Sequence, residues 1–325
     1  MVIRLVFGGR SMKVDIIGAG NWGRNLIRVF CTLLGQKNVT VCDTDVVKLE
    51  EIRRLFPGIR TVTTPTWEGD AAVIATPPET HYSLAVEAIE AGKDVLVEKP
   101  MTTSLADAQE LVSCADRLRR ILMVDHLLEY HPAVVELARM VREGRFGRIL
   151  YVHSQRLNAG VRRTDCNALW SLAPHDVSII CYLVPCDAEL KVVSAVGEVH
   201  GQHEATSAFL LRHSSGPSSL IHVSWLYPIK TRRLVLVGEE GSAVFDDLAG
   251  DKLVVYDGPP YQRGIPSAPI LDAIEPLVAV AEAFIESVET RKPPRTDGRD
   301  GMRVVSVLER VQAVMEKRRK HDPDG

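Results

Sequence analysis

Three glycines and one acidic residue near the N-terminus have the spacing of a dinucleotide-binding turn. Gly18, Gly20 and Gly23 form a G-x-G-x-x-G motif directly after the apolar residues 13–17, and Asp43 follows the last glycine by 20 residues. In such a motif the first glycine permits a tight turn, the second lets the backbone approach a pyrophosphate, and the third lets a helix pack closely on a strand. The helix N-terminus then holds the phosphates with its free N–H groups.

Asp43 predicts NAD rather than NADP as the dinucleotide. Its carboxylate can accept hydrogen bonds from ribose hydroxyls, whereas a 2′-phosphate at the same place would meet a like charge. At an effective dielectric constant near 20, two unit charges about 4 Å apart repel by roughly 4 kcal/mol before relaxation. Thr44 and Asp45 follow Asp43, so no arginine is adjacent to neutralise a phosphate.

Lys99 is a candidate for chemistry beside the dinucleotide. It follows the apolar segment 94–97 and precedes Pro100. This places a cation at the carboxyl end of a predicted parallel strand, the side on which open α/β sheets bind ligands. A solvated surface lysine is the alternative interpretation.

The composition is that of a globular protein of about two domains. The chain has 325 residues, of which 46% are hydrophobic and 25% charged, with a net charge of −3, so no overall basic field attracts nucleic acid or anionic lipid. No apolar run approaches the roughly 18 residues that span a bilayer. Residues 1–10 hold too short an apolar stretch for a signal peptide, and the closest cysteine pair, Cys181 and Cys186, lacks C-x-x-C spacing. We therefore expect a cytoplasmic protein with reduced thiols.

Two different patterns of elements divide the chain. Up to about residue 124, predicted strands alternate with helices, including one that Ser104 caps with Asp107 three residues later, which indicates a parallel sheet. Beyond it, helices are expected at 131–143 and 170–184, and two more, near 273–290 and 298–318, close the chain. Strands are expected at 148–157 and near 189–199, 205–212, 218–226, 232–238, 242–246 and 252–256. We predict an α/β protein with a Rossmann-type parallel-sheet domain (residues 1–124) and an α/β domain with a large, mostly antiparallel open sheet (residues 125–325).

The combination of motifs resembles the glucose–fructose oxidoreductase, inositol dehydrogenase and MocA (Gfo/Idh/MocA) family. The residues that carry the resemblance are the fingerprint, Thr76-Pro77-Pro78 with His81, and the triplet Glu98-Lys99-Pro100 after a buried strand. The resemblance covers about residues 13–318. It implies an NAD-dependent oxidoreductase in which Lys99 contacts the reacting hydroxyl and Pro100 follows a cis bond that aims Lys99. It also implies a homodimer or homotetramer formed through the C-terminal sheet.

The resemblance also assigns His175 as the catalytic histidine. Family members often have D-x-x-x-H-x-x-D at this point, whereas this chain has Ser171 and Ser178 in place of the two aspartates. Lys99 would stabilise the developing alkoxide while His175 takes the hydroxyl proton, since imidazole titrates near neutral pH. Which of the two is the formal base stays open. Asp176 is adjacent to His175 and, on a helix, faces about 100° away, so we do not assign it the missing role.

The segment 155–167 concentrates arginines before the histidine element and resembles the subgroup that acts on nucleotide-linked sugars, which includes UDP-N-acetylglucosamine 3-dehydrogenases. Arginine forks match phosphate oxygens well, and a solvated basic loop is the alternative. The residues predicted to bind the substrate are His126, Arg156, Asn158, Arg162, Arg163, Trp170 and His175. The residues predicted to bind NAD are Gly18, Gly20, Asn21, Trp22, Gly23, Asp43, Thr76, Pro77, His81, Glu98 and Lys99.

The predicted activity is oxidation, at C3, of a ring hydroxyl of a nucleotide-activated sugar such as UDP-N-acetylglucosamine. The resemblance places it in carbohydrate biosynthesis, with an aminotransferase as a pathway partner for the keto sugar. No side-chain cluster has metal-ligand spacing, so no metal is expected. Three alternatives stay open: a ketoreductase or a dehydrogenase of free or phosphorylated sugars or inositol, an NAD-dependent glycosidase that oxidises C3 only transiently, and a non-catalytic NAD-binding protein.

Overall fold

The chain forms two compact units. The computed structural model describes residues 12–159, 166–184, 190–201, 203–214, 216–262 and 264–321. The first unit comprises the described chain up to Asp125 together with Leu277–Met302, and the second comprises His126–Pro276 together with the described chain from Arg303. Residues 277–302 thus return to the first unit, whereas the sequence pattern placed all of 125–325 in the second domain.

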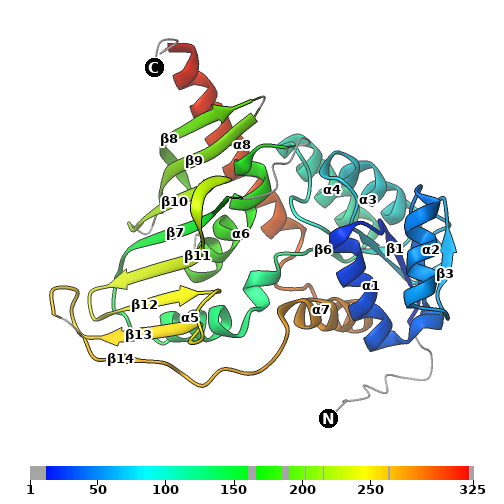
Figure 1. Ribbon diagram of the computed structural model, residues 1–325, viewed down its shortest axis with the longest axis horizontal. Coiled ribbons are helices and arrows are strands. Elements are labelled where there is room, and N and C mark those ends of the chain that lie inside the picture. The colour runs from blue at the N-terminus through cyan, green and yellow to red at the C-terminus, as the bar shows by residue number, and fades with distance from the viewer. Residues whose placement is uncertain are drawn as a thin grey trace. The chain divides into compact units, whose positions relative to one another are not determined.

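The first unit is built on a six-stranded parallel sheet (Figure 1). Its strand order is β3-β2-β1-β4-β5-β6, and every neighbouring pair is parallel. The strands are β1 (Val14–Ile17), β2 (Val39–Cys42), β3 (Arg60–Val62), β4 (Ala71–Ile74), β5 (Asp94–Val97) and β6 (Leu122–Val124). The four residues of β1, β4 and β5 are all buried, as expected for strands covered on both faces. The order reverses between β1 and β4, and ligands of such sheets bind outside the carboxyl ends of the strands at this point.

Helices cover both faces of the parallel sheet. They are α1 (Asn21–Leu34), α2 (Val46–Leu55), α3 (His81–Glu90), α4 (Leu105–Leu118) and α7 (Pro276–Thr290), with short 3-10 helices η1 (Gln36–Asn38) and η2 (Pro78–Thr80). The Ser104 side chain accepts a hydrogen bond from the Asp107 N–H, which confirms the predicted cap of α4. Helix α7 joins this unit because Phe284 packs edge-on against Phe30 of α1, with ring centroids 6.4 Å apart.

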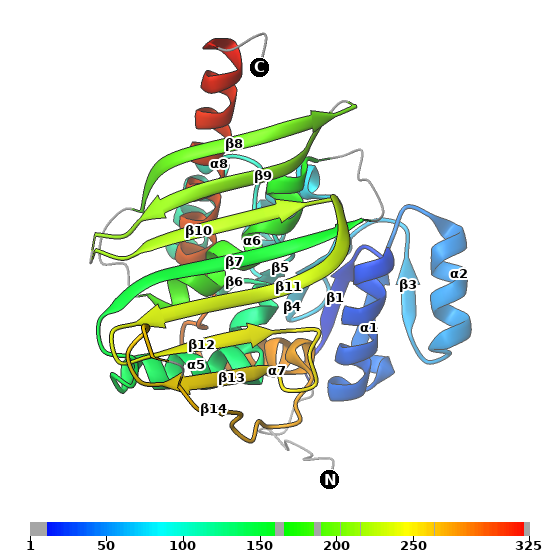
Figure 2. The ribbon, with the colours of Figure 1, turned by 60° about the vertical axis from the view of Figure 1, so that its left-hand side comes forward.

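The second unit contains an eight-stranded sheet of order β14-β13-β12-β11-β7-β10-β9-β8 (Figure 2). Its strands are β7 (Ile149–Ala159), β8 (Lys191–His200), β9 (His203–Arg212), β10 (Ser218–Ser224), β11 (Leu226–Gly238), β12 (Gly241–Asp246), β13 (Leu253–Asp257) and β14 (Pro266–Ser267). The pair β7 and β10 is parallel and the other neighbouring pairs are antiparallel. The predicted fold class, with its mostly antiparallel second sheet, is therefore confirmed.

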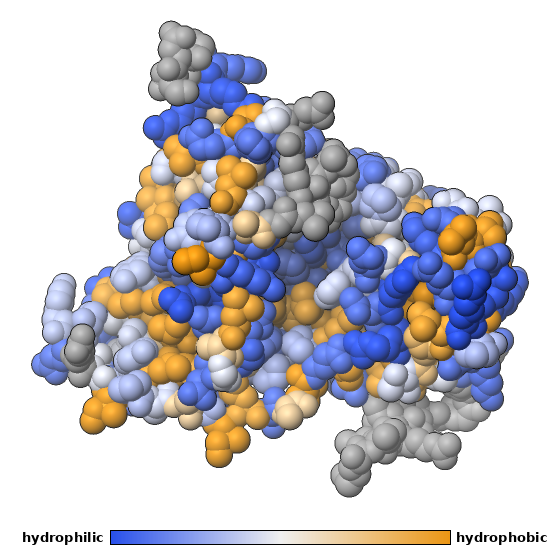
Figure 3. All heavy atoms as spheres, viewed as in Figure 1, coloured by the Kyte–Doolittle hydropathy of each residue, from blue (hydrophilic) through white to orange (hydrophobic). Residues whose placement is uncertain are grey.

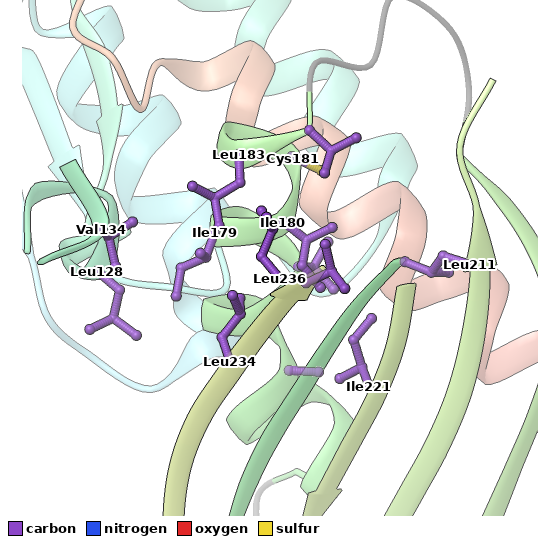
Figure 4. Packing of buried hydrophobic residues seen from close by; sticks show 14 of the residues in the cluster. Leu128, Val134, Ile179, Ile180, Cys181, Leu183, Leu211, Ile221, Leu234 and Leu236 are labelled. Carbon is purple, nitrogen blue, oxygen red and sulfur yellow. The ribbon is translucent and has the colours of Figure 1, made fainter. Parts of the chain in front are cut away.

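One face of this sheet packs against helices to form the core of the second unit. The helical elements are η3 (Leu127–Tyr130), α5 (Pro132–Arg142), α6 (Ala168–Leu183) and the later part of α8 (Gly298–His321). Figure 4 shows Ile180 of α6 packed towards the sheet residues Ile221, Leu234 and Leu236, all of which belong to one buried cluster. This packing fixes α6, the helix that carries the predicted histidine. Among the described residues, no helix is both long enough and apolar enough to cross a membrane.

Candidate active site

The glycine turn of the first unit has the close contacts that require glycine at its first and third positions. Gly18 has a φ of +105°, and a Cβ added there would lie 2.5 Å from the Ala75 carbonyl oxygen. A Cβ on Gly23 would lie 2.1 Å from the Gly18 carbonyl oxygen, so α1 approaches the turn too closely for any other residue. A Cβ on Gly20 would meet nothing within 4 Å. The middle glycine therefore faces open space, which suits the approach of a pyrophosphate.

The N-terminus of α1 is prepared for an anion. The helix begins at Asn21 after Gly20, without a side-chain cap and without an acidic residue in its first turn. The first N–H groups of a helix have no partner within the helix and carry a partial positive charge. Because no side chain of this segment satisfies or opposes that charge, the turn fits the pyrophosphate of a dinucleotide.

Asp43 lies at the carboxyl end of β2 and is held by the backbone. Its Oδ2 accepts a hydrogen bond of 2.7 Å from the Ala19 N–H, and its Oδ1 accepts one of 2.9 Å from the Asp45 N–H. A carboxylate has about four acceptor positions, so capacity for ribose hydroxyls remains. The Lys48 ammonium, which the sequence interpretation did not include, lies 3.8 Å from Oδ1 and offsets part of the negative charge.

Removing the charge of Asp43 should weaken the preference for NAD. In Asp43→Asn we expect the ratio of NADP affinity to NAD affinity to rise about tenfold, because relief of even a third of the charge repulsion corresponds to that factor. Dissociation constants for both dinucleotides, measured by calorimetric titration, test this. Asp116→Asn, a change of an exposed acid on α4, should leave the ratio as in the unchanged protein. Equal binding of NAD and NADP by the unchanged protein would refute the role of Asp43.

His81 ties two turns of the site together. Its Nδ1 lies 2.8 Å from the Pro100 carbonyl oxygen and its Nε2 lies 2.8 Å from the Thr76 carbonyl oxygen. The ring is buried, and burial lowers its pKa. Thr76 and the exposed Pro77 follow β4, beside the Gly18 turn. His81 therefore holds the main chain of two turns at the predicted NAD site, and its contribution to NAD binding stays a prediction.

Lys99 follows β5 at the same edge of the sheet as Gly18 and Asp43. The Lys99–Pro100 bond is cis, as the family resemblance implied. Lys99 is partly exposed, whereas Glu98 is buried and its Oε2 accepts a 3.1 Å hydrogen bond from the Lys99 N–H. The predicted NAD-binding residues and Lys99 thus gather at the carboxyl edge of one parallel sheet, where a ligand of this fold binds.

Asp125 belongs to this edge and was missed by sequence reasoning. It follows β6, is 1% exposed, and its Oδ2 accepts a 3.1 Å hydrogen bond from the Trp22 indole N–H. Trp22 lies in the first turn of α1, inside the fingerprint. Asp125 acts on the neighbouring Glu98, because burial together with the charge of Asp125 raises the pKa of Glu98 well above its ordinary value.

In the second unit, α6 carries the predicted histidine. His175 is partly exposed while its Nδ1 is buried. Ser171 and Ser178, which stand where family members often have aspartates, are both buried. The Ser178 hydroxyl donates a 2.6 Å hydrogen bond to Oε1 of the buried Glu129, which follows His126 on η3. A buried carboxylate from another element thus faces the position of the second missing aspartate.

Arg156 holds α6 to the sheet. Its Nε donates a 2.7 Å hydrogen bond to Asp176 Oδ2, and the Ser154 hydroxyl donates one of 2.6 Å to Asp176 Oδ1. All three side chains are buried. Asp176 directly follows His175 in α6. The ion pair with Arg156 therefore fixes the helix segment that carries the histidine. The predicted contact of Arg156 with substrate stays a prediction beside this structural role.

Asn158 lies further along β7 and is oriented by a second arginine. Arg232 of β11 donates a 2.9 Å hydrogen bond from Nη2 to Asn158 Oδ1 and others from Nη1 to the carbonyl oxygens of Leu157 and Thr231. Burial and the neighbouring Arg156 cation lower the pKa of Arg232. Sequence reasoning did not include Arg232, because it lies 74 positions from Asn158.

The remaining predicted substrate residues have different surroundings. His126 is 1% exposed, and its Nδ1 lies 3.9 Å from Glu129 Oε1. Trp170 is partly exposed and packs against the core of the second unit. Arg162 and Arg163 lie outside the residues that the structure describes.

Both units match one family of known proteins. Residues 12–126 match the oxidoreductase family with an NAD-binding Rossmann fold known as Gfo/Idh/MocA, and residues 134–244 match the C-terminal domain of the same family. The chain therefore belongs to the Gfo/Idh/MocA family. It is an oxidoreductase, and its cofactor is NAD.

Similar proteins include several sugar and polyol dehydrogenases. A UDP-N-acetylglucosamine 3-dehydrogenase of Acidithiobacillus ferrooxidans is 25% identical over 316 residues, which cover 94% of this chain and 97% of that protein. A solved structure of that enzyme superimposes with a TM-score of 0.83, covering 94% of this chain and 98% of that one. The WlbA dehydrogenase from Bordetella pertussis, solved with NADH and UDP-GlcNAcA, shares the fold at a TM-score of 0.79 and 21% identity, covering 95% of this chain and 97% of that one. Inositol 2-dehydrogenase 2 of Saccharopolyspora erythraea is 30% identical over 183 residues, covering 54% of each chain.

Proposed function

We propose that this enzyme oxidises a ring hydroxyl, at C3, of a nucleotide-activated hexose such as UDP-N-acetylglucosamine, with NAD as hydride acceptor. The observation that carries the proposal is the extent of similarity. The likeness to UDP-N-acetylglucosamine 3-dehydrogenase covers 94% of this chain, and that to inositol 2-dehydrogenase 2 covers 54%. The substrate-binding half of such an enzyme decides which alcohol is oxidised, so a likeness that includes this half is the better guide.

Lys99 and His175 are the residues proposed to handle the proton. Oxidation of an alcohol removes a hydride from carbon, which bound NAD accepts, and a proton from oxygen, which the protein must accept. The Lys99 ammonium stabilises negative charge that develops on the oxygen, and the His175 imidazole takes the proton. A hydrogen bond from the Lys99 main-chain N–H to the Glu98 side chain holds Lys99 in the first unit. The buried ion pair of Arg156 with Asp176 holds the helix segment of His175 in the second unit.

Asn158 and the arginines of the second unit are proposed to hold the sugar nucleotide. With its Oδ1 engaged by Arg232, the Asn158 amide presents its N–H groups as donors. Arg156 pairs with the buried Asp176, and Arg232 lies near Arg156 and the carboxylates of Asp176 and Asp247. A diphosphate is the anion that an arginine fork matches best.

A substrate panel tests the proposal. UDP-N-acetylglucosamine, other UDP- and dTDP-sugars, free sugars, sugar phosphates and inositol are each incubated with NAD, with a ketone trap present because alcohol oxidation by NAD is often uphill. We expect NADH to accumulate with UDP-N-acetylglucosamine and little with inositol or free sugars. Release of free sugar without net NADH would instead identify a glycosidase. NADH from inositol alone would identify a polyol dehydrogenase, the class of inositol 2-dehydrogenase 2, which is 30% identical over 54% of this chain.

The outer face of the eight-stranded sheet supports the proposal of a homodimer or homotetramer. Its strands expose several large apolar side chains, and Figure 3 shows apolar residues over this unit. The exposed residues are Tyr151, Val193, Val196, Val199, Leu220, Leu226, Tyr227 and Ile229. A patch of this kind is typical of an interaction surface. The further proposals from the sequence are a cytoplasmic location, a place in carbohydrate biosynthesis and an aminotransferase that consumes the keto sugar.

A further inference from the structure

Two buried carboxyl groups meet beside Lys99. Glu98 and Asp125 follow the neighbouring strands β5 and β6, in which Val97 pairs with Val124. One oxygen of each has a donor: Glu98 Oε2 accepts from the Lys99 N–H and Asp125 Oδ2 accepts from the Trp22 indole, each at 3.1 Å. The other oxygens, Glu98 Oε1 and Asp125 Oδ1, are buried and receive no hydrogen bond from any N–H or hydroxyl group of the described protein.

A single proton satisfies both of these oxygens. Two ionised carboxylates in contact would repel each other in a site that excludes water, and each would keep an unsatisfied buried oxygen. If Glu98 is a carboxylic acid, its hydroxyl donates to Asp125, and the pair carries one negative charge. Among the described residues, the charged groups that act on Glu98 are Asp125, which raises its pKa together with burial, and Lys99, which lowers it. The net effect raises the pKa of Glu98, which favours its protonated form.

The pair connects two segments that serve the cofactor site. The Glu98 side chain accepts a hydrogen bond from the main-chain N–H of Lys99. The Asp125 side chain accepts one from the indole N–H of Trp22, which lies in the first turn of α1. With a proton shared between the two carboxyl groups, a continuous chain of hydrogen bonds would run from the Lys99 turn to the dinucleotide fingerprint. Loss of the shared proton would replace the hydrogen bond between Glu98 and Asp125 by a charge repulsion. The Lys99 turn and the dinucleotide fingerprint would then be held less firmly.

We propose that Glu98 and Asp125 share one proton and act together as positioning residues for Lys99 and for Trp22 at the dinucleotide-binding turn. The pair touches the site through these two residues and is not itself the group that exchanges a proton with substrate. This inference depends on NAD being the cofactor and not on the identity of the sugar, so its test uses no sugar substrate.

The first experiment measures the stability of the cofactor-free full chain by urea unfolding from pH 5 to pH 9. The unfolded chain loses the Glu98 proton near the ordinary pKa of glutamate, whereas the folded chain keeps it to a higher pH. Stability from this group is therefore complete below the ordinary pKa and is lost as the pH rises through the raised one. Relative to Glu98→Gln, the folded-to-unfolded ratio of the unchanged protein should fall by up to about tenfold per pH unit in this range.

Matched variants separate a shared proton from mere packing. Asp125→Asn should reduce the same pH dependence, because it removes the charge that helps to raise the pKa of Glu98 and its amide can donate to the ionised Glu98 carboxylate. Glu90→Gln, a change of an exposed acid on α3, should keep the slope of the unchanged protein. If Glu98→Gln and the unchanged protein show parallel pH dependence, both carboxyl groups are ionised in the fold and the shared proton is refuted.

The second experiment measures NADH binding by fluorescence titration. Asp125→Ala removes the acceptor of the Trp22 indole and should weaken NADH binding about tenfold, the effect of losing one hydrogen bond to a charged group. Asp125→Asn retains an acceptor and should recover most of that loss. If Asp125→Ala binds NADH as tightly as the unchanged protein, the positioning of Trp22 is wrong. If Asp125→Ala does not fold, Asp125→Asn alone is the test. An affinity for NADH that is tenfold lower in Asp125→Asn than in the unchanged protein would then contradict the proposal.

Discussion

Replacing Lys99 by methionine should lower kcat by about 10²- to 10⁴-fold while the affinity for NAD changes little. The range is that of a group that assists proton transfer or stabilises a developing oxyanion. Methionine keeps the length of the side chain and removes its charge, so the loss would report on the ammonium group. In the proposed mechanism the Lys99 ammonium acts on the reacting oxygen, so its charge should be needed in the reaction more than in binding. Single-turnover kinetics and NADH titration measure the two quantities separately.

Lys93 offers a matched control for this prediction. It precedes β5, whereas Lys99 follows it, so the two lysines lie at opposite ends of one buried strand. Lys93→Met should leave kcat within about twofold of the unchanged enzyme, as is usual for a surface substitution far from the site. A Lys99→Met enzyme that turns over as fast as Lys93→Met would remove Lys99 from the proposed mechanism.

Replacing His175 by asparagine should reduce kcat/KM by about 10²- to 10⁴-fold, the usual contribution of a general base. If His175 takes the proton, the rate of the unchanged enzyme falls below the pH at which its imidazole becomes protonated. That acidic limb should disappear from the residual activity of His175→Asn. A kcat/KM profile over pH, measured with the best substrate of the panel, tests both effects.

His200 provides the control for His175. It is an exposed histidine on β8, in the same unit, and His200→Asn should keep both the rate and the acidic limb. An acidic limb that persists unchanged in His175→Asn would assign the base to another group, with Lys99 as the first candidate.

Most of the cofactor side of the site could be predicted because its residues are close to one another in sequence or follow strands. Gly18, Gly20 and Gly23 share one turn, and the alternation of buried strands with helices brings Asp43 and Lys99 to the same edge of the sheet. The family resemblance added the cis bond before Pro100. All of these depend on local sequence and on the one topology that parallel strands with short connections adopt.

The partners of these residues could not be predicted, because they come from distant positions or from short elements. Asp125 lies 103 positions from Trp22, and it follows β6, whose three residues are too few to show a periodic pattern. The contact of Arg232 with Asn158 depends on the register of β11 against β7. Periodicity likewise shows that α7 has an apolar face but not which core covers it, so its return to the first unit became clear only from the contact of Phe284 with Phe30.

The most direct test of the proposed reaction follows a deuterium atom from the sugar to the cofactor. UDP-N-acetylglucosamine carrying deuterium at C3 is incubated with the enzyme, NAD and a ketone trap, and the NADH formed is analysed by mass spectrometry, with sugar labelled at C4 as the comparison. We expect deuterium in the NADH from the C3-labelled sugar and none from the C4-labelled sugar. NADH that stays unlabelled with the C3-deuterated sugar, while the reaction proceeds, would contradict hydride removal from that carbon.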